Sequence, residues 1–153
     1  MPKITEVHES EWNTKNPPFD KYTALRIINA GSTEDGENGI ADENVYDFFI
    51  NMDNQYLNYE LKTVKQQPEM VRARFKYGMV LIGLALIREE SESRKTPDEE
   101  HTIDDDEGPN GNIEDKVEQI TKAIAPVLLP IIDSLGSLPV EDEQPFQASG
   151  EAT

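Results

Sequence analysis

The sequence contains no cysteine among its 153 residues. Without thiols there is no disulfide framework, no thiolate metal site and no cysteine nucleophile. The two histidines, His8 and His101, are too few and too far apart in the sequence for a zinc site built on imidazole. We therefore expect no metal ion and no cofactor.

Basic residues are also scarce. The chain has 14 Lys and Arg against 31 Asp and Glu, which gives a formal net charge of -17. Proteins that bind bare nucleic acid generally do so with cationic groups that displace counterions from the phosphates. We therefore expect no direct binding to nucleic acid.

Long hydrophobic runs are missing as well. The longest, residues 77–87 (YGMVLIGLALI), is well short of the ~20 residues that a helix needs to cross a bilayer. The amino terminus has no apolar stretch after a basic start, so it does not resemble a secretory signal. These features predict a cytoplasmic protein without a membrane span. A short membrane hairpin at residues 77–87 is the competing interpretation.

The acidic charge is unevenly distributed. Residues 31–41, 89–111 and 136–153 carry net charges of -3, -8 and -4, which account for -15 of the -17. Acidic stretches rich in Gly and Pro cannot bury enough apolar surface to pack. We therefore expect a flexible amino-terminal segment at 1–19, an acidic disordered linker at 94–111 and a disordered tail at 136–153.

Two helices are predicted in the first half of the chain. The first spans 21–30, with a strand at Thr23–Asn29 as the alternative. The second spans 43–65 and begins after Asp42, a good helix cap. Apolar residues recur in this segment at steps of three and four, as on one face of a helix. They are Val45, Phe48, Phe49, Met52, Tyr56 and Tyr59.

A third helix is predicted over 68–93, because Pro68 suits a first helical turn. Its second half is apolar on all sides, which indicates that other helices, of this chain or of a partner, surround it. Gly78, Gly83 and Ala85 allow a neighbouring helix to approach closely. We expect Asp at Gly83 or Leu84 to unfold the protein or to abolish assembly, because the charge would be buried without a partner.

The last helical region has the spacing of a coiled coil or helix bundle. Apolar residues follow alternating steps of four and three. They are Ile113, Val117, Ile120, Ile124, Val127 and Ile131. Pro126 and Pro130 cannot donate to the amide ladder, so we expect a kink or a break into helices 113–125 and 126–135.

Together these patterns predict an all-α fold. Residues 20–135 would form a single helical domain, a small bundle of four to five helices with an acidic disordered linker and tail.

No pattern of catalytic residues stands out. Residues 106–113 carry part of the pattern of a calcium-binding loop, but Gly108 and Val117 stand where that loop requires ligands. There is no Gly-x-Ser-x-Gly motif, and neither histidine lies beside a plausible Ser and Asp. We therefore expect no catalytic residue.

The sequence favours a non-catalytic helical accessory or adaptor subunit of a larger cytoplasmic assembly, or a self-associating bundle. Small helical subunits of multi-component bacterial defence systems, built around a larger ATPase, have this general profile. The expected partner-binding residues are the two amide-flanked tyrosines and the residues of the two apolar helices. They are Tyr56, Tyr59, Gly78, Gly83, Leu84, Ala85, Ile124, Val127 and Ile131.

Two alternatives come from other classes. An acidic DNA mimic, or another inhibitor protein, would use the negative charge but needs acids on a rigid surface. An enzyme of unrecognised type would use residues that no motif marks. Loss of activity on deleting residues 96–110 would favour the mimic, whereas a helix-packed adaptor should keep its partner.

Overall fold

The computed structural model describes residues 2–32, 45–95 and 111–137. Its elements are β1 (Ile4–Val7), the 3₁₀ helix η1 (Glu9–Thr14), β2 (Leu25–Asn29), the 3₁₀ helix η2 (Ala30–Ser32), β3 (Tyr46–Asn51), α1 (Gln55–Thr63), α2 (Pro68–Lys95) and α3 (Ile113–Gly136). The fold is therefore a helix-rich mixture of α and β structure. The predicted all-α bundle of four to five helices is wrong.

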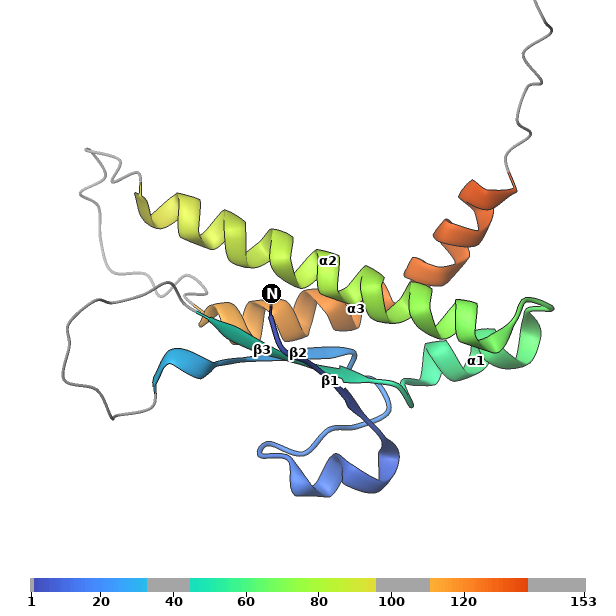
Figure 1. Cartoon of the computed structure of the whole chain (residues 1–153), viewed down its shortest axis with the longest axis horizontal. Helices are drawn as coiled ribbons and strands as arrows, with labels where there is room; N and C mark the ends of the chain where they lie inside the picture. Colours follow the sequence, from blue (N-terminus) through green and yellow to red (C-terminus); the bar gives the residue numbers. More distant parts are fainter. Residues whose placement is uncertain (1, 33–44, 96–110, 138–153) are drawn as a thin grey trace, which may run out of the picture.

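The three strands form one sheet in the order β1-β3-β2. β3 pairs parallel with β1 and antiparallel with β2, so that Phe48 lies between Ile4 and Ile27. α2 lies on one side of this sheet and η1 lies on the other (Figure 1). α3 runs along β2, where Glu114 accepts a hydrogen bond from the Asn29 amide and Thr121 donates one to the Leu25 carbonyl. The helix therefore covers the outer edge of β2.

Strands β2 and β3 lie in segments that were predicted to be helical. The predicted helix at 21–30 is β2, in agreement with the alternative strand at Thr23–Asn29. The predicted helix at 43–65 is β3 followed by the short helix α1. In β3, Tyr46, Phe48 and Ile50 are buried, and the two residues between them are partly exposed. Asn51, at the end of the strand, is also buried. This alternation is the period of a strand with one face on the core.

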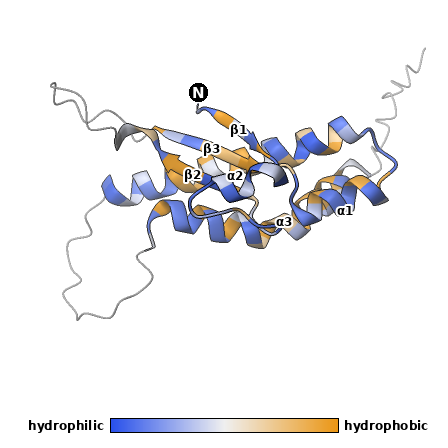
Figure 2. Ribbon diagram, turned by 90° about the horizontal axis from the view of Figure 1, so that it is seen from below, coloured by the Kyte–Doolittle hydropathy of each residue, from blue (hydrophilic) through white to orange (hydrophobic). Residues whose placement is uncertain are grey.

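α2 extends two residues beyond the predicted end at 93 and packs through one face only. Its buried residues are Val71, Phe75, Met79, Val80 and Gly83. At Gly83 a Cβ atom would lie 2.7 Å from Cε1 of Phe48 and 2.8 Å from Cδ2 of Leu25, so glycine lets the helix rest on the sheet. In Figure 2 the central strands are mainly orange, the colour of hydrophobic residues, where the helices pack.

α3 is one helix, Ile113–Gly136, although Pro126 and Pro130 lie inside it. Figure 1 shows that the carboxy-terminal part of α3 turns away from the sheet. Of the predicted kink or break between 113–125 and 126–135, the helix therefore has the kink and not the break. Proline removes an amide donor and crowds the preceding turn, which explains the bend. Beyond it, Ile131 and Leu135 are 55% and 63% exposed.

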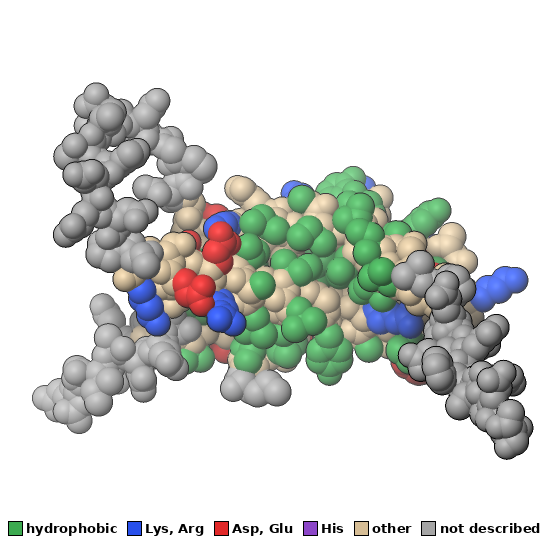
Figure 3. Space-filling view, turned by 90° about the horizontal axis from the view of Figure 1, so that it is seen from above, with side chains coloured by type: hydrophobic (Ala, Val, Ile, Leu, Met, Phe, Trp, Pro, Cys, Tyr) green, Lys and Arg blue, Asp and Glu red, His purple; other side chains and the backbone are tan. Residues whose placement is uncertain are grey.

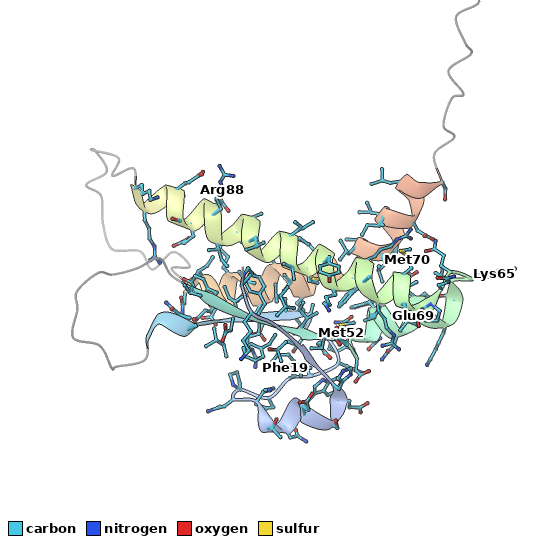
Figure 4. All side chains as sticks on the ribbon, viewed as in Figure 1. Phe19, Met52, Lys65, Glu69, Met70 and Arg88 are labelled. Carbon is cyan, nitrogen blue, oxygen red and sulfur yellow. The ribbon has the colours of Figure 1, made fainter. Side chains whose placement is uncertain are left out.

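The amino-terminal segment, predicted to be flexible over 1–19, contains β1 and η1. Val7 is fully buried, and the Trp12 indole Nε1 donates to Oδ1 of Asn51 at 3.1 Å. Figure 4 shows Phe19 on the side of the sheet away from α2. The segment thus covers the second face of the sheet.

The buried Asn51 side chain joins this segment to β3. Its Nδ2 donates to the carbonyls of Asp20 and Thr23 at 2.9 and 2.8 Å. Its Oδ1 accepts from Trp12 Nε1 and from the Asp53 amide, both at 3.1 Å. All four hydrogen-bonding positions of the amide are therefore used.

Asn51→Ala is expected to lower the free energy of unfolding by about 3 kcal/mol, because it leaves buried donors and acceptors without partners. Asn58→Ala is the matched control. The half-buried Asn58 side chain makes a single hydrogen bond, to the Asp53 carbonyl at 3.3 Å, so its loss should cost about 1 kcal/mol or less. Urea unfolding followed by circular dichroism measures both, and equal costs would contradict the role given to Asn51.

Candidate functional site

The outward face of α2 carries an exposed hydrophobic strip. Met70, Tyr77, Leu81 and Leu84 are 50%, 55%, 67% and 39% exposed. We call these four residues the outer stripe of α2. Figure 3 shows hydrophobic side chains gathered in the middle of the molecular face seen from above, with charged side chains toward its ends. Apolar side chains gathered on one face, unlike ones scattered singly, are a feature of interaction sites.

Charged residues belong to the same face of α2. Arg74 and Arg88 stand four residues after Met70 and Leu84, so that the whole series follows alternating steps of four and three. That spacing is the seam of a two-helix coiled coil. Arg74 is held by Asp133 at 3.4 Å, and Arg88 by Glu92 at 2.9 Å. Figure 4 marks Met70 and Arg88 toward opposite ends of the helix.

A groove of about 350 Å³ lies between α1 and α3. It is lined by Gln55, Tyr56, Tyr59, Glu60, Ala125, Pro126 and Pro130. We call it the tyrosine–proline groove. Its walls are mainly aromatic and aliphatic, with the amide of Gln55 and the carboxylate of Glu60 as polar groups. This combination is typical of a site that holds part of another protein.

Lysines and aromatic rings stand beside the groove. The Tyr22 ring lies 6.4 Å from the ring of Tyr56, which lines the groove. Nζ atoms of Lys21 and Lys122 lie 5.1 and 6.0 Å from the centre of the Tyr22 ring. The surroundings of the groove therefore combine positive charge with aromatic surface.

The predicted partner-binding residues separate into four groups. Leu84 and Ala85 lie on the outward face of α2, and Tyr56 and Tyr59 line the groove. On α3, Ile124 is half-buried, whereas Val127 and Ile131 are exposed.

Gly78 and Gly83 form the fourth group, because their close approaches are made within the chain. At Gly78 a Cβ atom would lie 2.8 Å from Cδ2 of Leu128 on α3, and Gly83 lies against the sheet. The structure thus brings Tyr56 and Tyr59 together with α3, and it separates both glycines from the exposed surfaces.

Met70, Tyr77 and Leu81 are the surface residues that sequence reasoning missed. Their spacing with Leu84 contains the same steps of three, four and seven that marked the seam of α3. The signal was hidden because residues 77–87, in the middle of α2, are apolar on both faces.

Arg26 on β2 and Lys76 on α2 do not belong to one basic patch, because each is paired with an acidic residue. Arg26 is buried and binds Glu118 through Nε at 2.9 Å and Nη2 at 3.0 Å. Lys76 donates to Glu6 at 2.8 Å. This hydrogen bond lowers the pKa of the Glu6 carboxyl and raises the pKa of Lys76. Arg26 and Lys76 are therefore held by the domain's own acids.

No metal site is found in the part of the chain that the structure describes. Within residues 2–32, 45–95 and 111–137, no three His, Asp or Glu side chains lie together as metal ligands would. Residues 106–110 of the partial calcium-loop pattern lie outside this part.

No protein-family model, curated protein or solved structure matches the chain. The surfaces described above are therefore interpreted from their own chemistry. None of the described helices is long and apolar enough to cross a membrane.

Proposed function

We propose that this chain is a non-catalytic accessory or adaptor subunit of a larger cytoplasmic assembly, and that it binds a protein partner through the tyrosine–proline groove. The groove itself, about 350 Å³ between α1 and α3, is the observation that carries the proposal. A larger component, such as an ATPase, would supply the chemistry of the assembly, while this subunit supplies contacts.

The groove is built to hold a segment of polypeptide. Tyr59 is 63% exposed and Tyr56 is half-buried, so both offer ring surface at little cost in side-chain entropy. Pro126 and Pro130 make the facing wall rigid. Because Lys21 and Lys122 stand beside the aromatic end, an apolar segment with acidic residues fits best.

The distribution of charge favours a protein partner over DNA mimicry. The described residues contain all 14 Lys and Arg and 15 of the 31 acids, a net charge of -1. Several of these acids are bound by the domain's own cations, as in the pairs Glu118–Arg26, Glu6–Lys76 and Asp133–Arg74. A mimic needs acids displayed free on a rigid surface.

The test compares two exposed tyrosines in affinity purification from the native host with quantitative mass spectrometry. Tyr59→Ala removes a groove residue, whereas Tyr77→Ala removes a tyrosine of similar exposure, 55% against 63%, from α2. We expect Tyr59→Ala to reduce recovery of the partner at least about tenfold, as for an aromatic residue central to an interface. Tyr77→Ala should keep it. Undiminished recovery with Tyr59→Ala would contradict the proposal.

A further inference from the structure

We propose that the outer stripe of α2 binds the outer stripe of a second copy of this chain, with the two α2 helices antiparallel. This inference concerns a different surface from the tyrosine–proline groove. It rests on the spacing of the stripe, on its length and on the charges within it.

The stripe has the length and pattern of a helix-pairing seam. From Met70 to Arg88 it covers 18 residue steps, which is about 27 Å of helix at 1.5 Å per residue. Alternating steps of four and three keep one seam toward a partner helix over this whole distance. The opposite face of α2 is fixed in the core by Phe75, Met79 and Gly83, so the stripe is presented on a rigid support.

The two arginines of the seam decide the direction of the partner. In a parallel pair, Arg74 and Arg88 would each face the same residue of the second copy, and two pairs of like charges would be forced together. In an antiparallel pair, the seam positions of one helix meet different positions of the other. Charge therefore favours a second copy that runs in the opposite direction.

One antiparallel register pairs the central part of the seam, from Tyr77 to Arg88, and brings Met70 opposite Lys95 of the second copy. It places Leu81 opposite Leu84 of the second copy. By the two-fold symmetry of the pair, Leu84 also lies opposite Leu81 of the second copy. In the next layers Tyr77 faces Arg88 of the second copy and Arg74 faces Ser91 of the second copy. Glu92, next in sequence to Ser91, brings a carboxylate close to Arg74.

The layer of Tyr77 and Arg88 is favourable in its own right. Tyr77 is 55% exposed, with Lys76 Nζ 5.4 Å from its ring centre, and the Arg88 side chain is 80% exposed and paired with Glu92. Both therefore keep open surface for a second contact. An arginine over a tyrosine face is a favourable cation–π pair. Moving the register by one heptad would place Leu84 against Arg74 or against Arg88 of the second copy, so the charges also select this alignment.

The first measurement is sedimentation equilibrium of the full chain over a range of concentrations. We expect a reversible dimer of twice the 17.3 kDa chain mass. Leu81→Glu should raise the dissociation constant at least about 100-fold, because it puts two carboxylates in the central layers. Leu81 is 67% exposed, so this variant should stay folded. Ile28→Glu, at a site 46% exposed on the far face of the sheet, should dimerise normally.

The second measurement tests direction and register by oxidation of engineered cysteines, which is clean because the chain has none of its own. An equal mixture of Tyr77→Cys and Arg88→Cys chains should form a disulfide between the two different chains. Each variant alone should not cross-link, since the antiparallel register separates its two cysteines by many residues.

A strictly monomeric wild-type chain, or cross-linking of Tyr77→Cys chains with each other, would overturn the proposal. Neither result would affect the groove, because the Tyr59→Ala comparison tests the proposed function separately.

Discussion

Gly83→Asp is expected to unfold the domain. A side chain at Gly83 would begin within 2.8 Å of atoms of both Phe48 and Leu25, which are fully buried. The substitution therefore combines overpacking of the core with burial of an unpaired carboxylate. We expect a loss of about 3 kcal/mol or more in the free energy of unfolding, a large part of the stability of a typical domain. Thermal unfolding followed by circular dichroism measures it.

Leu84→Asp, one residue further along α2, is the matched control. Leu84 is 39% exposed on the outward face, so a carboxylate there remains hydrated. We expect a folded protein that has lost about 1 kcal/mol or less. Within one chain, the expectation that Asp would be buried therefore holds at Gly83 and not at Leu84. That Leu84→Asp abolishes assembly stays a prediction. Equal stability of the two variants would show that α2 does not rest on the sheet at Gly83.

Glu118→Ala is expected to cost about 3 kcal/mol, because it removes the partner of a buried guanidinium. Only 9% of the Arg26 side chain is exposed, and Glu118 binds it through two hydrogen bonds. The remaining contacts of Arg26 are with the Pro17 carbonyl and, at 4.4 Å, with the Phe19 ring. Neither contact supplies a negative charge. Arg26 thus joins β2 to α3 through Glu118, and to the amino-terminal segment through Pro17 and Phe19.

Gln119→Ala on the same helix serves as the control for Glu118→Ala. Gln119 is exposed, so its truncation should change the free energy of unfolding by about 0.5 kcal/mol or less. Urea unfolding of both variants, compared with the wild type, separates the two effects. A cost below about 1 kcal/mol for Glu118→Ala would indicate that water solvates Arg26 and that the pair contributes little.

The helices that begin at Pro68 and Ile113 were predictable, because their starts carry local signals. Pro68 suits a first helical turn, and Asn112 precedes the second helix. The strands were not predictable from the same signals. Steps of three and four among the apolar residues of 45–59 imitate a helix, although Phe48 and Phe49 belong to opposite faces of a strand. Residues 46–51 form a strand because they pair with β1 and β2, which are distant in the sequence. The periodicity of apolar residues within the segment cannot reveal this pairing.

The candidate surfaces were predictable in part. The amide-flanked tyrosines Tyr56 and Tyr59 were chosen for their chemistry, and both line the groove. The facing prolines predicted a kink or a break in the helix, and the kink is present. Their place in the wall of a groove was not predictable, because it depends on the position of α1. The outer stripe was missed for a related reason. An all-round apolar helix predicts complete burial, whereas the three-stranded sheet and α3 cover only one face of α2.

The central claim is that one face of α2 is built into the core and the other is left open for association. Cysteine labelling of Leu81→Cys and Met79→Cys in dilute protein tests it most directly, since the chain has no other thiol. We expect Leu81→Cys to react with a maleimide at nearly the rate of the urea-unfolded protein, and more slowly as the concentration rises and the stripe is covered. Met79→Cys, at a fully buried position, should stay protected throughout. Equal protection of the two thiols in dilute protein would contradict the claim.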